Sequence, residues 1–209
     1  MRNTRPYNEL ADLLRHNSVK TGGRYLLASG TESTVYVDAK LTTCTARGAK
    51  LVGQAFITKF EELGWHPEAV GGLVIGADPI VMAIARQSLE TGRDINAFLV
   101  RKEAKKHGLL KYIEGVEHTN GLEVVIIDDV CTTGESTVVA IERARTAGMT
   151  VLGAICLVDR QQGAEDQIAK QHHCPFASIF TLDELLTNTD GHLTTRTHEV
   201  PSQREVPVA

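Results

Sequence analysis

The stretch VVIIDDVCTTGES, residues 124–136, decides the fold that we predict for this chain. Residues 124–127 are an uninterrupted run of β-branched apolar side chains, which is typical of a strand buried on both faces. Two acids, Asp128 and Asp129, follow directly, and a short turn of threonine and glycine leads to a helix that begins near Ser136. Strand, turn and helix in this order are part of a βαβ unit, in which successive strands lie parallel.

The turn at residues 131–136 is suited to bind a phosphate. Backbone N–H groups and three hydroxyls gather there at the N-terminus of a helix, whose dipole favours negative charge. Gly134 lets the backbone approach a phosphate closely. Asp128 and Asp129 would repel a phosphate, but a carboxylate can accept two hydrogen bonds from a vicinal diol. The combination predicts a 5-phosphoribosyl ligand; the alternative is an ordinary turn in which Asp129 or Ser136 only caps the helix.

The rest of the chain alternates apolar strands with helices. Because parallel strands need such crossovers, the alternation predicts an α/β fold with a parallel, doubly wound sheet covered on both faces. Residues 25–38 alternate and contain Ser29-Gly30, which predicts a hairpin or extended segment. Ligands of such sheets bind beyond the carboxyl ends of the strands. The predicted strands are residues 69–75, 95–100, 123–127, 151–158 and 178–182, and the predicted helices are 5–16, 46–63, 79–89, 136–147 and 164–171.

Length and composition indicate an ordinary soluble domain. The chain has 209 residues, of which 42% are hydrophobic and 23% charged, with a formal net charge of −4. We expect one domain over residues 1–190 and a flexible tail at 191–209. The sequence shows neither a membrane span of roughly 20 apolar residues nor a signal peptide. Its acidic total gives no general attraction to nucleic acid, and four cysteines without a CxxC pair predict reduced thiols in a cytoplasmic protein.

A second motif, RKEAKKHGLLK at residues 101–111, follows one of the predicted strands. It contains five of the 22 lysines and arginines of the chain together with His107, against one acid, Glu103. A solvated surface face is the ordinary explanation. A basic loop with a hinge at Gly108 could instead close over a diphosphate and stabilise the charge that develops as this group leaves a ribose. We favour the second interpretation, because the cluster lies at a strand end of an otherwise acidic chain.

Both motifs resemble those of a known family. Residues 124–136 resemble the type I phosphoribosyltransferase motif that binds the ribose 5-phosphate of phosphoribosyl pyrophosphate (PRPP). RKEAK-x-HG narrows the resemblance to the orotate phosphoribosyltransferases. The resemblance implies that Lys105 and Asp129 are catalytic. It also implies a PRPP site formed by Arg101, Lys102, Lys105, Lys106, His107, Asp128, Asp129, Val130, Cys131, Thr132, Thr133, Gly134, Glu135 and Ser136.

Two positions predict the base that receives the ribosyl group. Thr132 stands where purine enzymes of the resembled family often have an acid, and its hydroxyl can hydrogen-bond a pyrimidine. Arg160, in LVDRQQG, can form a bidentate pair with a carboxylate such as that of orotate, although a surface arginine is the alternative. By resemblance, a small N-terminal hood lies mainly in residues 1–40, and its stretch LLASGTESTVYVD at residues 26–38 covers the base, with Tyr36 against its ring.

The sequence departs from some relatives at two positions. Ala28 and Ile80 stand where certain members of the resembled family carry lysines. Near Ile80, we expect the backbone of Ala77 and Asp78 to contact the pyrophosphate instead.

The resemblance implies a reaction: transfer of the 5-phosphoribosyl group from PRPP to orotate, giving orotidine 5′-monophosphate and pyrophosphate in pyrimidine biosynthesis. It further implies Mg²⁺ bound mainly through PRPP, without dedicated metal ligands from the protein. A homodimer in which the basic loop reaches the neighbouring active site is also implied. Membranes and nucleic acids are not expected partners. Two alternatives stay open: a phosphoribosyltransferase for uracil or a purine, and a non-enzymatic PRPP-sensing regulator that binds nucleic acid.

Overall fold

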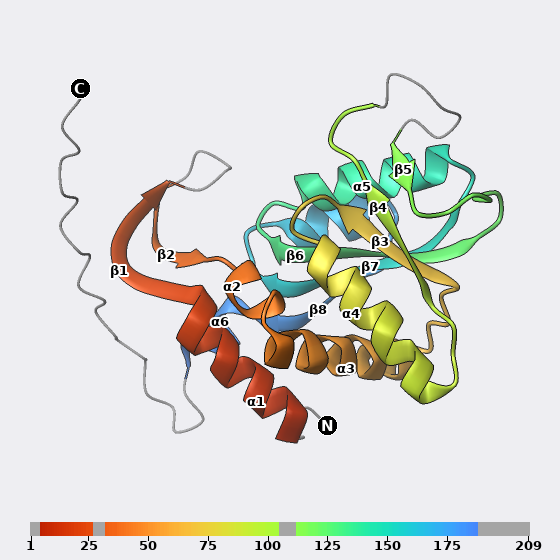
Figure 1. The fold of residues 1–209 in the computed structure, drawn as a ribbon. Helices are drawn as coiled ribbons and strands as arrows, with labels where there is room; N and C mark the ends of the chain where they lie inside the picture. The colour runs from red at the N-terminus through yellow and green to blue at the C-terminus, as the bar shows by residue number, and fades with distance from the viewer. Residues whose placement is uncertain (1–4, 27–31, 105–111, 188–209) are drawn as a thin grey trace, which may run out of the picture.

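The centre of the molecule is a six-stranded sheet with the order β5-β4-β3-β6-β7-β8 (Figure 1). The computed structural model describes residues 5–26, 32–104 and 112–187. Five of these strands run parallel, as predicted, and the edge strand β5 is antiparallel to β4. The sheet is therefore mixed rather than wholly parallel. The strands are β3 (Ala69–Leu73), β4 (Asn96–Val100), β5 (Ile113–Glu114), β6 (Glu123–Cys131), β7 (Thr150–Asp159) and β8 (Phe176–Thr181).

Helices cover both faces of the sheet, which confirms the doubly wound architecture. α3 (Ala46–Leu63) and α4 (Asp78–Ser88) lie on one face, and α5 (Glu135–Thr146) lies on the other (Figure 1). The predicted bounds of α3 are confirmed to the residue. Its first turn is capped by the Thr45 hydroxyl, which accepts a hydrogen bond from the Gly48 N–H, and it ends at Gly64, whose φ of +67° suits glycine.

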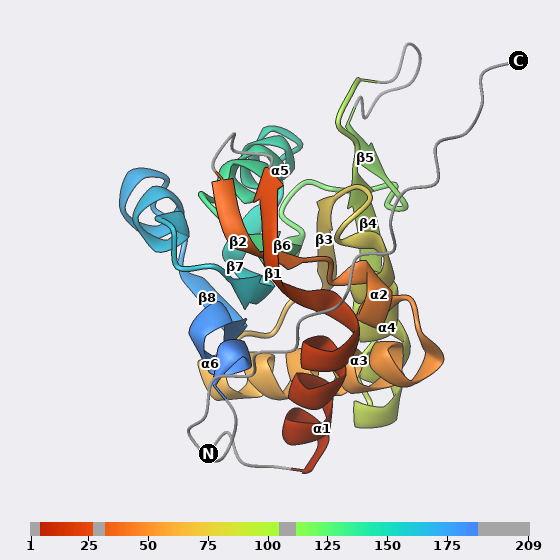
Figure 2. The ribbon, with the colours of Figure 1, turned by 90° about the vertical axis from the view of Figure 1, so that its left-hand side faces the viewer.

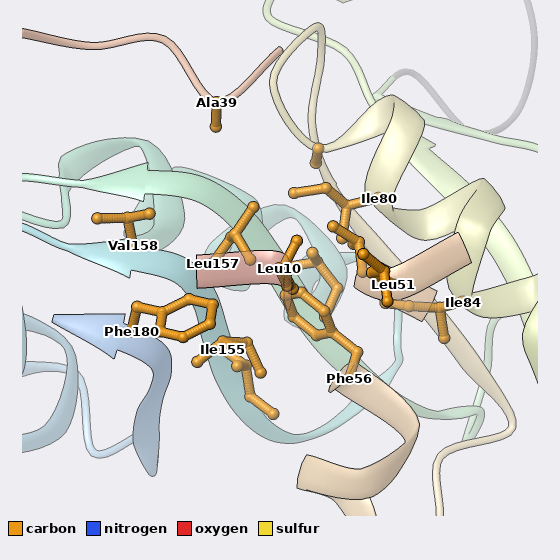
Figure 3. Packing of buried hydrophobic residues seen from close by; sticks show 14 of the residues in the cluster. Leu10, Ala39, Leu51, Phe56, Ile80, Ile84, Ile155, Leu157, Val158 and Phe180 are labelled. Atoms are coloured by element: carbon orange, nitrogen blue, oxygen red, sulfur yellow. The ribbon is translucent and has the colours of Figure 1, made fainter. Parts of the chain in front are cut away.

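The apolar run at the start of β6 supplies two cores at once. Val125 and Ile127 belong to the core under α3 and α4, while Val124 and Ile126 belong to the core under α5. Successive side chains of a strand point to opposite faces, so a strand covered on both sides has to be apolar throughout. Figure 3 shows part of the first core, where residues of α3, α4, β7 and β8 meet. Each such fully buried side chain contributes about 1.5–3 kcal/mol to folding.

The N-terminal region packs beside the sheet and then rises over its strand ends. It consists of α1 (Arg5–Leu13), the π-helical turn η1 (Leu14–Ser18) and the antiparallel pair β1 (Val19–Leu26) and β2 (Glu32–Val37). Figure 2 shows β1 and β2 in front of the central strands. Long-range hydrogen bonds anchor its base: the Tyr7 hydroxyl donates to the Ile179 carbonyl at 2.7 Å, and Arg15 donates to the carbonyls of Leu185 (3.0 Å), Glu184 (3.0 Å) and Thr187 (3.3 Å). The antiparallel pair agrees with the hairpin alternative for residues 25–38, but its first strand begins six residues earlier, at Val19. We keep the name hood for β1 and β2.

Several elements differ from the sequence-based prediction. β6 continues through both acids to Cys131 instead of ending at residue 127, since Val130 and Cys131 still pair with β7. The helix predicted at 164–171 is mostly a π-helical segment, η3 (Asp166–Gln171). The short elements β5, α2 (Lys40–Thr43), η2 (Leu89–Thr91) and α6 (Leu182–Leu186) were not predicted. The tail predicted at 191–209 lies outside the described residues. No helix in the described part of the chain is both long and apolar enough to cross a membrane.

Candidate active site at the carboxyl ends of the strands

Asp128 is buried at the end of β6 and is fully engaged by its own strand–turn–helix unit. Its Oδ2 accepts hydrogen bonds from the hydroxyls of Ser136 (2.8 Å) and Thr137 (2.6 Å), and its Oδ1 accepts from the Asp129 N–H (2.9 Å). Burial, together with the neighbouring charge of Asp129, raises the pKa of Asp128 to about 6. Through its hydrogen bonds to Ser136 and Thr137, the Asp128 carboxylate connects β6 to the first turn of α5 and so fixes the shape of the turn between them.

Asp129 points to the other side of the strand and reaches the surface of the site. Its side chain is 17% exposed, and its Oδ1 accepts a hydrogen bond from the Val130 N–H at 2.9 Å. The loop after β3 lies against it so closely that a Cβ on Gly76 would come within 2.3 Å of Oδ1. The two adjacent acids thus have different surroundings: Asp129 is open to a ligand, whereas the oxygens of Asp128 are occupied by the protein.

The turn between β6 and α5 has the form expected of a phosphate site. Gly134 adopts a φ of +90° immediately before the helix, a conformation in which a side chain would be strained. Thr132, Thr133 and Ser136 are partly exposed on this turn. Cys131 differs from the prediction in one respect, because its side chain lies in the core under α5 and only its backbone faces the site.

The loop between β3 and α4 forms the wall of the site opposite the turn between β6 and α5. The Val74–Ile75 peptide bond is cis, and Gly76 and Ala77 follow it into the N-terminus of α4. Burial raises the pKa of Asp78, whose Oδ1 is buried without a hydrogen-bond partner among the described residues. This loop reaches Asp129 because β3 pairs directly with β6 in the sheet.

Arg160 follows β7 and connects the sheet to the hood. Its Nη2 donates to the Ser33 hydroxyl and to the Val35 carbonyl, both at 3.1 Å. The residue is only 5% exposed, burial lowers the pKa of its guanidinium, and its Nε has no partner among the described residues. The backbone N–H of Arg160 donates to the Cys131 carbonyl at 2.8 Å, so Arg160 and Thr132 lie on neighbouring strand ends.

Tyr36 lies on β2 of the hood and packs within the hairpin. Its ring stacks on that of Tyr25 with centroids 5.5 Å apart. The prediction that Tyr36 contacts the base stays a prediction.

The basic motif lies only partly within the described residues. Arg101 follows β4 and its Nη1 is 3.3 Å from Glu114 Oε1, while Lys102 is exposed. Lys105, Lys106 and His107 lie outside the described residues. Arg143 of α5 holds both flanks of this segment: it donates to the carbonyls of Arg101 and Lys102, and its guanidinium stacks on the Tyr112 ring at 4.2 Å.

Sequence reasoning missed four residues that structure this edge: Ser33, Lys40, Thr137 and Arg143. Lys40 Nζ is 2.7 Å from Asp38 Oδ1 and 4.0 Å from Asp129 Oδ2, and the hydrogen bond to Asp38 raises the pKa of Lys40. Only Thr137 left a readable signal, since a second hydroxyl next to Ser136 at a helix start can bond the acid at the preceding strand end. The other three act across large sequence separations.

Comparisons with known proteins agree with this geometry. Residues 44–179 match the family model of the phosphoribosyl transferase domain. The orotate phosphoribosyltransferase of Corynebacterium glutamicum is 41% identical over 180 residues, covering 86% of this chain and 94% of the relative. That of Synechocystis is 43% identical over 176 residues, covering 84% of this chain and 86% of the relative.

Solved structures show the same relationship. The Mycobacterium tuberculosis orotate phosphoribosyltransferase in complex with Fe(III) dicitrate superposes with a TM-score of 0.74 at 38% identity, covering 85% of this chain and 97% of that one. The same enzyme in complex with PRPP gives 0.70 at 34% identity, covering 85% and 96%. The acids of β6, the glycine turn and Arg160 gather at one edge of the sheet. Together with these sequence and structure matches, this arrangement shows that the chain belongs to the orotate phosphoribosyltransferases, enzymes of pyrimidine biosynthesis.

Proposed function

We propose a division of labour for the transfer of the 5-phosphoribosyl group from PRPP to orotate by this enzyme. The observation that carries it is that Asp129, the turn at 132–136 and Arg160 occupy one edge of the sheet. The turn binds the 5-phosphate through the backbone N–H groups of Thr132, Thr133, Gly134, Glu135 and Ser136 and through the Thr133 hydroxyl, while the Ser136 hydroxyl donates to Asp128. Asp128 holds this turn in shape, and the backbones of Val130 and Cys131 complete it.

Asp129 receives the ribose. Its accessible carboxylate accepts the hydroxyls of the diol and favours the positive charge that the anomeric carbon gains as the diphosphate leaves. Displacement then needs no protein nucleophile. Lys105, with Arg101, Lys102, Lys106 and His107, neutralises the departing diphosphate.

Mg²⁺ is the proposed cofactor and is held mainly by oxygens of PRPP and by water. The partly exposed carboxylate of Asp129 could accept a hydrogen bond from a magnesium-bound water at this edge. When bound, the ion neutralises charge on the diphosphate.

Arg160 and Thr132 receive orotate. The Nη2 group of Arg160 is held by the hood, while its buried Nε–H lacks a partner among the described residues. A buried donor of this kind gains most from an anionic acceptor, because leaving it unpaired costs about 1–3 kcal/mol. The carboxylate of orotate is such an acceptor, and the Thr132 hydroxyl on the neighbouring strand end can bond the pyrimidine.

The assignment is tested by following orotate absorbance with purified protein, PRPP and Mg²⁺, with uracil and hypoxanthine as alternative acceptors. We expect consumption of orotate only. Lys105→Ala should lower kcat by about 10²–10³-fold with an unchanged melting temperature, because it removes a cation from the charge that develops in the transition state. Turnover of uracil or hypoxanthine at the rate of orotate would contradict the base assignment, and full activity of the variant would contradict the role of Lys105.

We further propose a homodimer with shared active sites, in a cytoplasmic protein. Exposed apolar side chains before, within and after α4, namely Ile75, Met82 and Leu89, support an interface there. A chain carrying Lys105→Ala mixed with one carrying Asp129→Ala should regain activity if the basic segment serves the neighbouring site. Failure to regain activity after demonstrated subunit exchange would place each site within one chain.

The division of the chain is also a proposal. We propose that residues 1–190 form one domain and that 191–209 are a flexible tail. Removal of residues 191–209 should then leave turnover and melting temperature unchanged.

A further inference from the structure

Lys40 lies just after the hood in the chain, beside Asp129 at the end of β6. It is the first residue of the short helix α2, which follows β2 in the chain. Its Nζ is 2.7 Å from Asp38 Oδ1 and 4.0 Å from Asp129 Oδ2. The side chain is 43% exposed, so the ammonium group is held in place by these two acids without being sequestered from a ligand.

The charges at this point do not suit an anionic ligand unless a cation is added. Asp38 and Asp129 present carboxylates to the site, and the buried Asp128 lies directly behind Asp129. A diphosphate brought beside these acids is repelled by them at short range. Lys40 is the cation that lies between Asp38 and Asp129, and it can compensate this repulsion.

The loop that forms the opposite wall carries no cation of its own. Residues 76–80 read GADPI and contain neither lysine nor arginine. Gly76 packs directly on Asp129, so the backbone of this loop and the ammonium of Lys40 approach the same carboxylate. A cation for a group bound at this wall therefore has to come from another element, and α2 supplies one.

The stereochemistry of PRPP brings its diphosphate to this place. The sugar is an α-D-ribosyl 1-diphosphate, in which the C1 substituent lies on the same face of the ring as the 2- and 3-hydroxyls. A carboxylate that accepts those hydroxyls faces the same side of the ring as the diphosphate. A lysine at 4.0 Å from this carboxylate, with a flexible four-carbon stem, can thus reach a diphosphate oxygen.

We propose that Lys40 binds the diphosphate of PRPP, exchanging its contact with Asp38 for a diphosphate oxygen when the substrate arrives. The inference rests on the proposed role of Asp129 as the acceptor of the ribose diol. The exchange is easy, because a partly exposed lysine–aspartate pair contributes only about 0–1 kcal/mol. Lys40 thereby supplies from α2 the positive charge that the loop after β3 lacks.

The test compares Lys40→Met with Lys40→Arg and with Lys50→Met, which removes an exposed lysine of α3. Titration calorimetry measures Mg²⁺–PRPP, Mg²⁺–pyrophosphate and ribose 5-phosphate, a ligand that has the sugar and phosphate but no diphosphate. For Lys40→Met we expect about 10- to 100-fold weaker binding of PRPP and pyrophosphate, and less than about threefold for ribose 5-phosphate. Lys40→Arg should recover most of the loss, and Lys50→Met should match the parent enzyme.

The outcomes separate this proposal from the one on which it rests. If the parent enzyme binds PRPP but Lys40→Met binds it equally well, the role of Lys40 is refuted and the proposed function stands. If Lys40→Met loses PRPP and ribose 5-phosphate to the same degree, Lys40 only orients Asp129 and does not bind the diphosphate. If the parent chain itself binds no PRPP, both proposals fail. Circular dichroism and melting temperature of each variant establish that the fold is retained.

Discussion

The two halves of the site are held together in different ways. On the ribose-phosphate side, Asp128 bonds Ser136 and Thr137, which are eight and nine residues away along one strand–turn–helix unit. On the base side, Arg160 bonds Ser33 across 127 residues, so its geometry depends on how the hood packs on the sheet. Hydrogen bonds within this single unit hold the first half. The second half requires the whole fold, and this difference predicts different consequences of mutation.

Asp129→Ala should give the largest loss of activity. The variant removes the accessible carboxylate on which the ribose and its developing charge depend, so we expect kcat/KM for PRPP to fall by about 10²–10³-fold. Stability should change little, because the side chain is partly exposed and its carboxylate bonds only a neighbouring backbone N–H and lies beside Lys40. Steady-state kinetics measure the effect, with the exposed Asp94→Ala as the matched control. Activity within threefold of the parent would remove Asp129 from the ribose site.

Asp128→Asn should change the pH dependence of stability. The pKa of Asp128 is about 6 in the folded protein against an ordinary 3.8, so the native state binds a proton that the unfolded chain has released between these values. The free energy of unfolding of the parent should therefore fall as pH rises through this window. In the variant this group does not titrate. The parent should lose about 2 kcal/mol relative to the variant between pH 4.5 and 7.5.

Denaturant unfolding at several pH values measures this difference. Asn keeps the shape of the side chain, and the hydroxyls of Ser136 and Thr137 can reorient to bond it. Parallel stability curves for parent and variant would mean that Asp128 is not the buried acid described here.

Arg160→Ala tests the base side. Removing the guanidinium should raise the KM for orotate by about 10- to 30-fold, because a charged hydrogen-bond donor to the substrate carboxylate is lost. The KM for PRPP should change much less, since its binding groups lie in the locally held half. Arg24→Ala, an exposed arginine of β1, is the control. An equal rise in both KM values would show that Arg160 supports the whole site rather than orotate.

How much of this molecule could be predicted follows the same division. The bounds of α3 were predictable because an apolar stripe, a threonine cap and a final glycine all lie within its own sequence. The acids and glycine turn after β6 were predictable for the same reason. The prediction that β6 ends at residue 127 was wrong, since pairing with β7 rather than composition carries the strand to Cys131.

Contacts between distant residues could not be predicted from local pattern. Nothing near Arg143 shows that it holds the carbonyls of Arg101 and Lys102, more than forty residues earlier. The antiparallel strand β5 is two residues long and carries no periodicity of its own. The contact between Lys40 and Asp129 could not be predicted either, because the two residues come together only when the N-terminal region has packed on the sheet.

Ser33→Ala should give the smallest effect and the sharpest test of the difference between the halves. The Ser33 hydroxyl accepts a hydrogen bond from Arg160 Nη2 and also bonds the N–H and carbonyl of Val35 in its own strand. The Val35 carbonyl accepts a second hydrogen bond from Arg160 and remains in the variant. We therefore expect the KM for orotate to rise only about three- to fivefold, the net worth of one neutral acceptor. Ser33→Thr keeps the hydroxyl and should restore the parent value. An effect on PRPP instead of orotate would mean that the hood positions the sugar, and the two halves of the site would then be one cooperative unit.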